Sequence, residues 1–240
     1  MTINKGATVT LNVKGQGNSL TSTNGSGIGV YQNSNIIIKG TGSTGSQLTV
    51  TAGAGRNVGI GFIIEGYHGG GTYGDIEISG VTLSVTANTG GENIDSGTAI
   101  GMTGASYDSE DAVICGNITI SNATVTANSK KLSACIGTSA WNNNWQNCSL
   151  GVISIKNSTV TATSGGLEGY SDTAACIGFG AVGSGCNVTI RKIEIEASTL
   201  NLTNIGGYKV GKGTNYGTAT ITEGIIVGGD SKGSEGWNPS

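Results

Sequence analysis

The segment Gly116-Asn-Ile-Thr-Ile-Ser-Asn-Ala-Thr-Val-Thr-Ala127, followed by Ala134-Cys-Ile-Gly137, contains the unit from which the chain is built. Apolar and polar residues alternate in Ile118-Thr-Ile120 and again in Thr124-Val-Thr126, as they do in strands with one buried face. The dipeptide Ile136-Gly137 closes the unit and predicts a third short strand. The unit therefore predicts three short β-strands in a fixed order.

The unit recurs along the chain with gaps of variable length. Its Ile-Gly copies begin at Ile28, Ile60, Ile100, Ile136 and Ile177, and Val210-Gly211 is a degenerate copy. A constant block with elastic spacing is typical of solenoids, because each coil packs only on its neighbours and insertions become loops. Apolar residues at helical spacing are absent. We therefore expect an all-β chain, a right-handed parallel β-helix with about three strands per coil and about five to six coils.

The repeat covers nearly all of the 240 residues, and no linker interrupts it, so we expect a single domain over residues 1–240. The polar tail over residues 228–240 is expected either to cap the last coil or to be disordered. Met1 is not followed by the apolar core of a signal peptide, which is expected of a fragment that lacks its signal sequence.

Low charge argues against several classes of partner. The net charge is -3, and the 12 Lys and Arg residues are scattered, so no basic face for nucleic acid is expected. No apolar run approaches the roughly 18 residues of a membrane span. The five cysteines form no CxxC pair, which argues against structural zinc. We expect small buried thiols, with one or two disulfides between stacked coils as the alternative.

Successive coils are expected to place hydroxyl residues above one another on the second strand, because stacked strands lie about 4.8 Å apart. Such files suit the solvated face of a sheet. They also resemble the threonine files of antifreeze solenoids, which implies ice binding as an alternative, although Lys130 and Lys131 flank the face. The two expected files are Thr49, Thr82, Thr124, Thr159 and Thr199, and Thr51, Ser84, Thr126, Thr161 and Asn201.

Small residues flank the isoleucine of each Ile-Gly copy, such as Gly27 and Gly29, or Gly59 and Gly61. If the isoleucine points into the core, alternation directs both neighbours outward, and they would form the glycine floor of a groove. Two alternatives stay open. A loop of the same chain lies across these residues, or they occupy a tight corner.

Most aromatic residues lie in the gaps beside the Ile-Gly strands, so we expect a row of rings at one corner of successive coils. Aromatic rings stack on the C–H faces of sugars, and nearby carboxylates and amides bond to sugar hydroxyls. The coil rise of about 4.8 Å also resembles one sugar unit of a β-1,4-linked chain. The pattern predicts a site for an extended polysaccharide. Its stacking candidates are Trp141, Trp145, Tyr107, Tyr67, Tyr73 and Tyr31, and its hydrogen-bonding candidates are Asp108, Asn143 and Asp172.

Catalysis is not expected, because a hydrolase needs two carboxyl groups across the scissile bond and none of the candidate carboxylates lies on a repeated strand, where a scaffold would hold it. A polysaccharide lyase or glycoside hydrolase is the alternative. Its acidic candidates are Glu168 and Asp172 in a later loop, and Asp108, Glu110 and Asp111 in an earlier one. These three residues are also the weak candidates for a calcium site, but they lack the spacing of a known calcium loop. No cofactor is otherwise expected.

The quoted repeat resembles the glycine-rich β-helix repeats of bacterial cell-surface and secreted proteins. It is also similar to β-helical carbohydrate-binding modules that accompany xylanases in gut bacteria, over roughly residues 27 to 205. This resemblance implies a noncatalytic, monomeric module, secreted or on the cell surface, that holds a catalytic domain of the same polypeptide on xylan or a similar plant polysaccharide. An adhesin or structural stalk without a small ligand is the other alternative.

Overall fold

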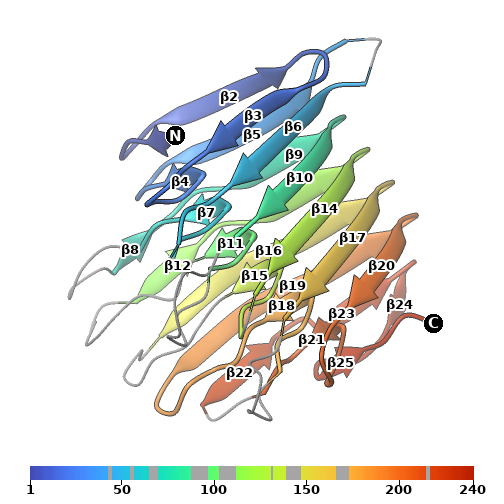
Figure 1. Cartoon of the computed structure of the whole chain (residues 1–240). Coiled ribbons are helices and arrows are strands. Elements are labelled where there is room, and N and C mark those ends of the chain that lie inside the picture. The colour runs from blue at the N-terminus through green and yellow to red at the C-terminus, as the bar shows by residue number, and fades with distance from the viewer. Residues whose placement is uncertain are drawn as a thin grey trace.

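The computed structural model describes residues 1–42, 45–54, 57–64, 70–87, 97–102, 112–130, 132–138, 147–165, 173–214 and 217–240. Within these ranges the chain is all-β, and most strands pair in parallel and stack along one axis from the N-terminus to the C-terminus (Figure 1). The prediction of an all-β, parallel, solenoid-like chain is confirmed. The described part contains no helix with the length and hydrophobicity of a membrane span.

Three sheets run along the axis, and the chain visits them in turn. We name them the long sheet, the threonine sheet and the Ile-Gly sheet. The described strands of the long sheet are β2 (Thr8–Val13), β5 (Asn35–Gly40), β8 (Gly71–Thr72), β9 (Ile76–Ser79), β12 (Val113–Cys115), β13 (Ile118–Ser121), β16 (Cys148–Lys156), β19 (Asn187–Glu196), β22 (Thr218–Ile221), β23 (Ile225–Val227) and β24 (Asp230–Ser231). Those of the threonine sheet are β3 (Asn18–Thr21), β6 (Gln47–Thr51), β10 (Thr82–Thr86), β14 (Thr124–Ser129), β17 (Thr159–Ser164) and β20 (Thr199–Thr203). Those of the Ile-Gly sheet are β1 (Thr2–Ile3), β4 (Ile28–Val30), β7 (Ile60–Phe62), β11 (Ile100–Met102), β15 (Ile136–Thr138), β18 (Ile177–Phe179), β21 (Val210–Gly211) and β25 (Gly236–Trp237).

The core consists of apolar files that run from coil to coil. Parallel pairing in register places Ile76 beside Ile118 and Ile118 beside Ile153 in the long sheet. The same rule places Val125 beside Val160 in the threonine sheet and Ile136 beside Ile177 in the Ile-Gly sheet. All of these side chains are inaccessible to solvent. Since full burial of an aliphatic side chain contributes about 1.5–3 kcal/mol, register is set by the need to keep each file inside.

Left-handed backbone makes the corner between the long sheet and the threonine sheet. Asn122 and Asn157 have φ angles of 49° and 48°, and Gly80 and Ala197 have 61° and 46°. Asparagine and glycine adopt this conformation more readily than other residues, and their recurrence directly after β9, β13 and β16 turns the chain at the same point in three coils. The corner lets the next strand start directly, as in the step from Ser121 to Thr124.

Glycine is required in the Ile-Gly sheet because neighbouring coils approach closely there. Gly137 and Gly178 are directly paired and have φ angles of 135° and 126°. A Cβ atom on Gly137 would overlap the carbonyl oxygen of Gly178, and one on Gly178 would overlap that of Gly211. A side chain here would meet both backbone strain and a clash with rigid backbone.

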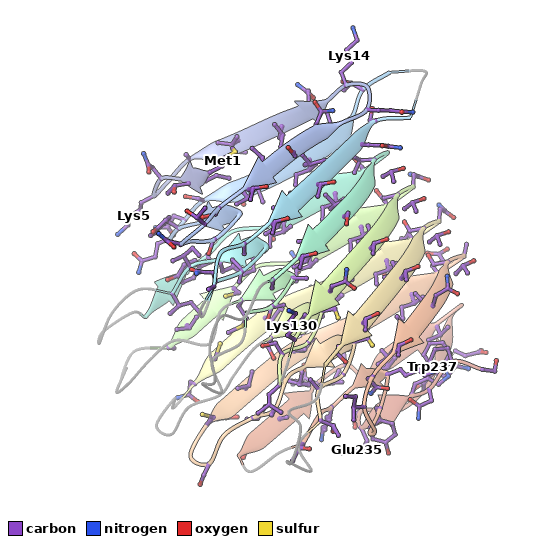
Figure 2. The ribbon with its side chains drawn as sticks, in the orientation of Figure 1. Met1, Lys5, Lys14, Lys130, Glu235 and Trp237 are labelled. Carbon is purple, nitrogen blue, oxygen red and sulfur yellow. The ribbon has the colours of Figure 1, made fainter. Side chains whose placement is uncertain are left out.

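The C-terminal tail folds back on the last coil. β24 pairs antiparallel with β23, and β25 pairs antiparallel with β21, which brings Trp237 opposite Val210. Trp237 packs against the core, and Lys212 forms an ion pair of 2.7 Å with Glu235. Figure 2 shows Glu235 and Trp237 at the end of the stack opposite Met1 and Lys14. Antiparallel pairing thus covers strand edges that a further coil would otherwise need to cover.

Substitution of Gly137 by Ala tests the close stacking. We expect Gly137→Ala to lower the free energy of unfolding by at least about 3 kcal/mol, because strain and overpacking add. Gly17→Ala is the control, since Gly17 also has a positive φ of 76° but open space around it. It should lose only about 1 kcal/mol. Urea denaturation measures both values, and equal losses would show that packing between coils does not require this glycine.

Candidate functional site

The Ile-Gly strands were the expected floor of a groove, and for the described residues this prediction is wrong. The isoleucines are buried as expected, but so are the glycines, including Gly61, Gly101 and Gly137. The chain curls around two of the dipeptides: the N–H of Ala134 donates to the carbonyl of Thr138 (3.4 Å), and that of Ala175 to the carbonyl of Phe179 (3.0 Å). Both faces of the strand are therefore covered.

The cover comes from the segments on either side of the Ile-Gly strands. The N–H of Ala181 donates to the carbonyl of Leu132 (2.8 Å), and the N–H of Gly180 donates to the carbonyl of Thr138 (2.9 Å). These bonds join the flanks of neighbouring coils, and Leu132 is only 1% exposed. The chain itself occupies the space that the groove would need, which is one of the two alternatives left open by the sequence.

The residue before each isoleucine lies at a tight corner, which is the second alternative. A Cβ on Gly27 would overlap Val50 of the threonine sheet, and a Cβ on Gly59 would overlap Val85. Later coils carry Ala99, Cys135 and Cys176 at this position, all fully buried. Small residues recur here because the chain passes from one sheet to the next against the core.

Two residues of the predicted aromatic site, Tyr73 and Tyr31, lie within the described residues. Tyr73 is 2% exposed, and its ring centroid lies 6.0 Å from that of Phe62 at an interplanar angle of 58°. A ring packed in the core cannot stack on a sugar, so the assignment of Tyr73 to the site is wrong. Tyr31 is half-buried, and its N–H donates to the carbonyl of Ile3 (3.2 Å). The other candidates lie outside the described residues: Trp141, Trp145, Tyr107, Tyr67, Asp108, Asn143, Glu168, Asp172, Glu110 and Asp111.

The outward side of the threonine sheet forms a regular polar surface, which we call the hydroxyl face. Its side chains stand in three files along the axis and alternate with buried Leu, Val and Ala along each strand. The files are Gln47, Thr82, Thr124, Thr159 and Thr199; Ser19, Thr49, Ser84, Thr126, Thr161 and Asn201; and Thr21, Thr51, Thr86, Asn128, Thr163 and Thr203.

This register corrects the expected files at β6. Thr49 pairs with Ser84 rather than with Thr82, whose partner is Gln47. The shift is two residues, and a shift of two leaves every side chain on the same face, so alternation alone could not detect it. The buried residues indicate the correct register, because Leu48 pairs with Leu83 and Val50 pairs with Val85. The correction adds a third file to the surface.

The hydroxyl face is flat and carries no charge. None of the strands β3, β6, β10, β14, β17 and β20 contains Asp, Glu, Lys or Arg. The polar groups repeat about every 4.8 Å along the axis and about every 6.6 Å along a strand. Figure 1 shows the six strands side by side along the stack. The surface therefore presents hydroxyl, amide and methyl groups at fixed intervals.

The long sheet is charged on its outward side. Lys156 lies 3.2 Å from the carboxylates of both Glu194 and Glu196, and Lys192 lies 2.8 Å from Glu194. Lys192 and then Lys156 hold the pKa of Glu194 below its usual value. The ammonium group of Lys192 is therefore held by a neighbouring carboxylate.

The described residues contain no cluster of three or more His, Cys, Asp or Glu side chains that could hold a metal ion. The carboxylate of Asp75 accepts from the backbone N–H of Asn117 (2.7 Å) and from its side-chain amide (3.0 Å). The N–H of Asp75 in turn donates to the side-chain oxygen of Asn35 (2.7 Å). These bonds join three successive coils where the long-sheet strands bend.

Comparisons with protein-family models, curated proteins and solved structures give no match. The function must be argued from the chain's own surface. The hydroxyl face is a regular array of one chemical kind, because polar residues recur there on all six described strands of one sheet.

Replacement of Tyr73 tests its assignment to the core. We expect Tyr73→Ala to lower the free energy of unfolding by about 3 to 4 kcal/mol because it removes a buried ring. Tyr31→Ala, which removes a half-buried ring, should cost about 1 kcal/mol. Urea denaturation measures both, and affinity electrophoresis at a temperature where both variants are folded measures polysaccharide binding. A Tyr73→Ala variant with normal stability and no polysaccharide binding would show that Tyr73 belongs to the binding site and not to the core.

Proposed function

We propose that this chain is a noncatalytic carbohydrate-binding module whose hydroxyl face binds an extended, uncharged plant polysaccharide such as xylan. One observation carries the proposal: the face is a flat, charge-free array of threonine, serine, asparagine and glutamine in three files. Hydroxyl and amide groups both donate and accept hydrogen bonds, as sugar hydroxyls do. The array can therefore pair with many sugar hydroxyls at once.

The shape of the surface favours an ordered or extended ligand. A flat sheet cannot enclose a small sugar, and small-molecule sites are usually concave. Files that repeat about every 4.8 Å can instead make equivalent contacts with successive units of a long chain. The summed contacts of such an array would compensate for weak individual hydrogen bonds, which contribute only about 0.5–1.5 kcal/mol each.

The absence of charge favours a neutral polysaccharide over an anionic one. An acidic polymer such as pectin would be attracted by Lys or Arg, and the strands of this face contain neither. The threonine methyl groups also offer small apolar contacts to the C–H groups of sugar rings. The proposal therefore ranks xylan and β-glucan above pectin as ligands.

Paired charges on the hydroxyl face should weaken binding to xylan. Thr126 and Thr161 are direct neighbours on β14 and β17, in the middle file. We expect Thr126→Glu/Thr161→Lys to weaken binding to xylan at least about tenfold, because the ligand would strip water from two charges without replacing it. Affinity electrophoresis in gels with xylan, β-glucan or pectin measures the change.

The matched control places the same pair on the other sheet. Thr119 and Ser154 are direct neighbours on β13 and β16, so Thr119→Glu/Ser154→Lys introduces the same charges in the same cross-strand geometry. This variant should bind like the wild type. Equal retardation of all three proteins would exclude the hydroxyl face as the binding surface. If no polysaccharide retards the wild type but growing ice takes it up, the same regular array is an ice-binding face instead.

The aromatic residues outside the described ranges allow a second, separable test of the same function. If Trp141 and Trp145 stack on sugars, we expect Trp141→Ala/Trp145→Ala to reduce retardation by xylan at least about tenfold, since stacking on an aromatic ring is a large part of sugar affinity. Asn143→Ala, in the same segment, tests the predicted hydrogen bond from Asn143 to the sugar separately from the stacking. Unchanged retardation in the double variant would remove the two tryptophans from the site.

The proposal also covers the handedness of the coils, their number, the oligomeric state and the location of the module. We expect right-handed coiling, as parallel crossover connections favour, and about five to six coils. We also expect a monomeric module, secreted or on the surface of a bacterium, attached to a catalytic domain that acts on the same polysaccharide. An adhesin or stalk would show no glycan binding, and a lyase or hydrolase would release unsaturated products or reducing ends.

A further inference from the structure

Two of the five cysteines occupy equivalent positions in neighbouring coils. Cys135 and Cys176 directly precede Ile136 and Ile177, which are register partners in the Ile-Gly sheet. The N–H groups of Cys135 and of Ile136 both donate to the carbonyl of Cys176, at 3.0 Å each. Directly opposed residues of stacked parallel strands lie about 4.8 Å apart, within the Cα–Cα range of about 4.4–6.8 Å that disulfides span. The backbone geometry of this pair therefore suits a disulfide.

The two side chains also have equivalent surroundings. Both cysteines are fully buried at the corner between the threonine sheet and the Ile-Gly sheet. Ser129 lies 3.3 Å from the Cys135 sulfur and Ser164 lies 3.7 Å from the Cys176 sulfur, and these serines are themselves register partners. The two thiols therefore lie beside equivalent serines at the same corner of neighbouring coils.

The other three cysteines do not share this geometry. The register partner of Cys115 is Leu150, and those of Cys148 are Val113 and Val188. Cys115 and Cys148 are therefore offset by two residues on neighbouring strands, which separates their Cα atoms by about 8 Å. Cys186 and Cys148 are offset in the same way, since Cys148 lies opposite Val188. Such pairs exceed the span of a disulfide unless the backbone moves.

The chemistry of the pair is suited to thiol–disulfide exchange. The neighbouring Cys135 thiol lowers the pKa of the Cys176 thiol, while burial raises the pKa of Cys135. A thiolate, not a thiol, attacks a disulfide, so Cys176 is the first nucleophile and Cys135 the resolving thiol. All five cysteines are thiols in the structure.

We propose that Cys135 and Cys176 are the one disulfide-forming pair of this chain, and that a low-molecular-weight disulfide such as oxidised glutathione oxidises them. The Cys176 thiolate attacks one sulfur of oxidised glutathione, breaks its S–S bond and releases one glutathione thiolate. Cys135 then loses its proton, attacks the Cys176 sulfur and releases the second glutathione. Two protein thiols become one disulfide, and one oxidised glutathione becomes two reduced molecules.

The consequence would be a covalent tie between two coils that are otherwise joined by backbone pairing and packing. A disulfide between residues 135 and 176 closes a loop of roughly 40 residues, which restricts the unfolded chain strongly. Both thiols are buried, so the folded protein must open locally before an oxidant can reach them. Oxidation during folding is the faster route, because the thiols are then accessible.

The test refolds the full chain from urea with oxidised or with reduced glutathione. After oxidation we expect three thiols of the original five, and a single linked peptide pair that contains Cys135 and Cys176 on nonreducing mass mapping. The oxidised protein should melt about 5 to 15 °C higher than the reduced one, and reductant should reverse the shift.

Two variants make the result specific. Cys135→Ala copies Ala99, the residue at the same position one coil earlier, and should abolish both the link and the shift in melting temperature. Cys148→Val matches its register partners Val113 and Val188 and should keep both. Five thiols after oxidative refolding, a link through Cys115, Cys148 or Cys186, or a lasting glutathione adduct on Cys176 would each overturn the proposal.

Discussion

Close stacking of the Ile-Gly strands is the constraint on which the rest of the molecule depends. At this sheet the backbone of one coil leaves no room for a Cβ on the glycine of its neighbour, as at Gly137 beneath Gly178. The isoleucine beside each glycine is held in the core, and the flanking segments close over the strand from outside. Each coil can therefore repeat its path only in register with the coil before it.

That register is transmitted to the other two sheets. Because isoleucine lies over isoleucine in one sheet, Ile118 lies over Ile153 in the long sheet and Val125 over Val160 in the threonine sheet. The corner between the Ile-Gly and threonine sheets admits only small side chains, which is why glycine, alanine and cysteine recur there. The contact between Cys135 and Cys176 follows from this repetition, since two successive coils carry cysteine at the same corner.

The surfaces outside the stack differ in chemistry, and the difference guides the functional proposal. The long sheet carries lysine and glutamate in ion pairs, whereas the strands of the hydroxyl face carry no charge at all. A flat array of hydroxyl and methyl groups that repeats with each coil suits a partner with a repeat of its own. The Ile-Gly strands are enclosed and provide no groove, so the proposed binding surface is an outer sheet face.

The sequence by itself determined the three recurring strands, their order in each unit and the buried residues of the long-sheet and threonine-sheet strands. These follow from the local alternation in Ile118-Thr-Ile120 and Thr124-Val-Thr126 and from the recurrence of Ile-Gly, because a periodicity of two leaves only one face for the core. Only the tertiary structure decided the register of β6, the burial of Tyr73 and the closure of the Ile-Gly strands. A shift of two residues preserves alternation, and an aromatic residue in a glycine-rich gap has the same local pattern whether it faces solvent or the core. Burial depends on segments distant in sequence, such as the 132–134 and 180–182 flanks that meet across neighbouring coils.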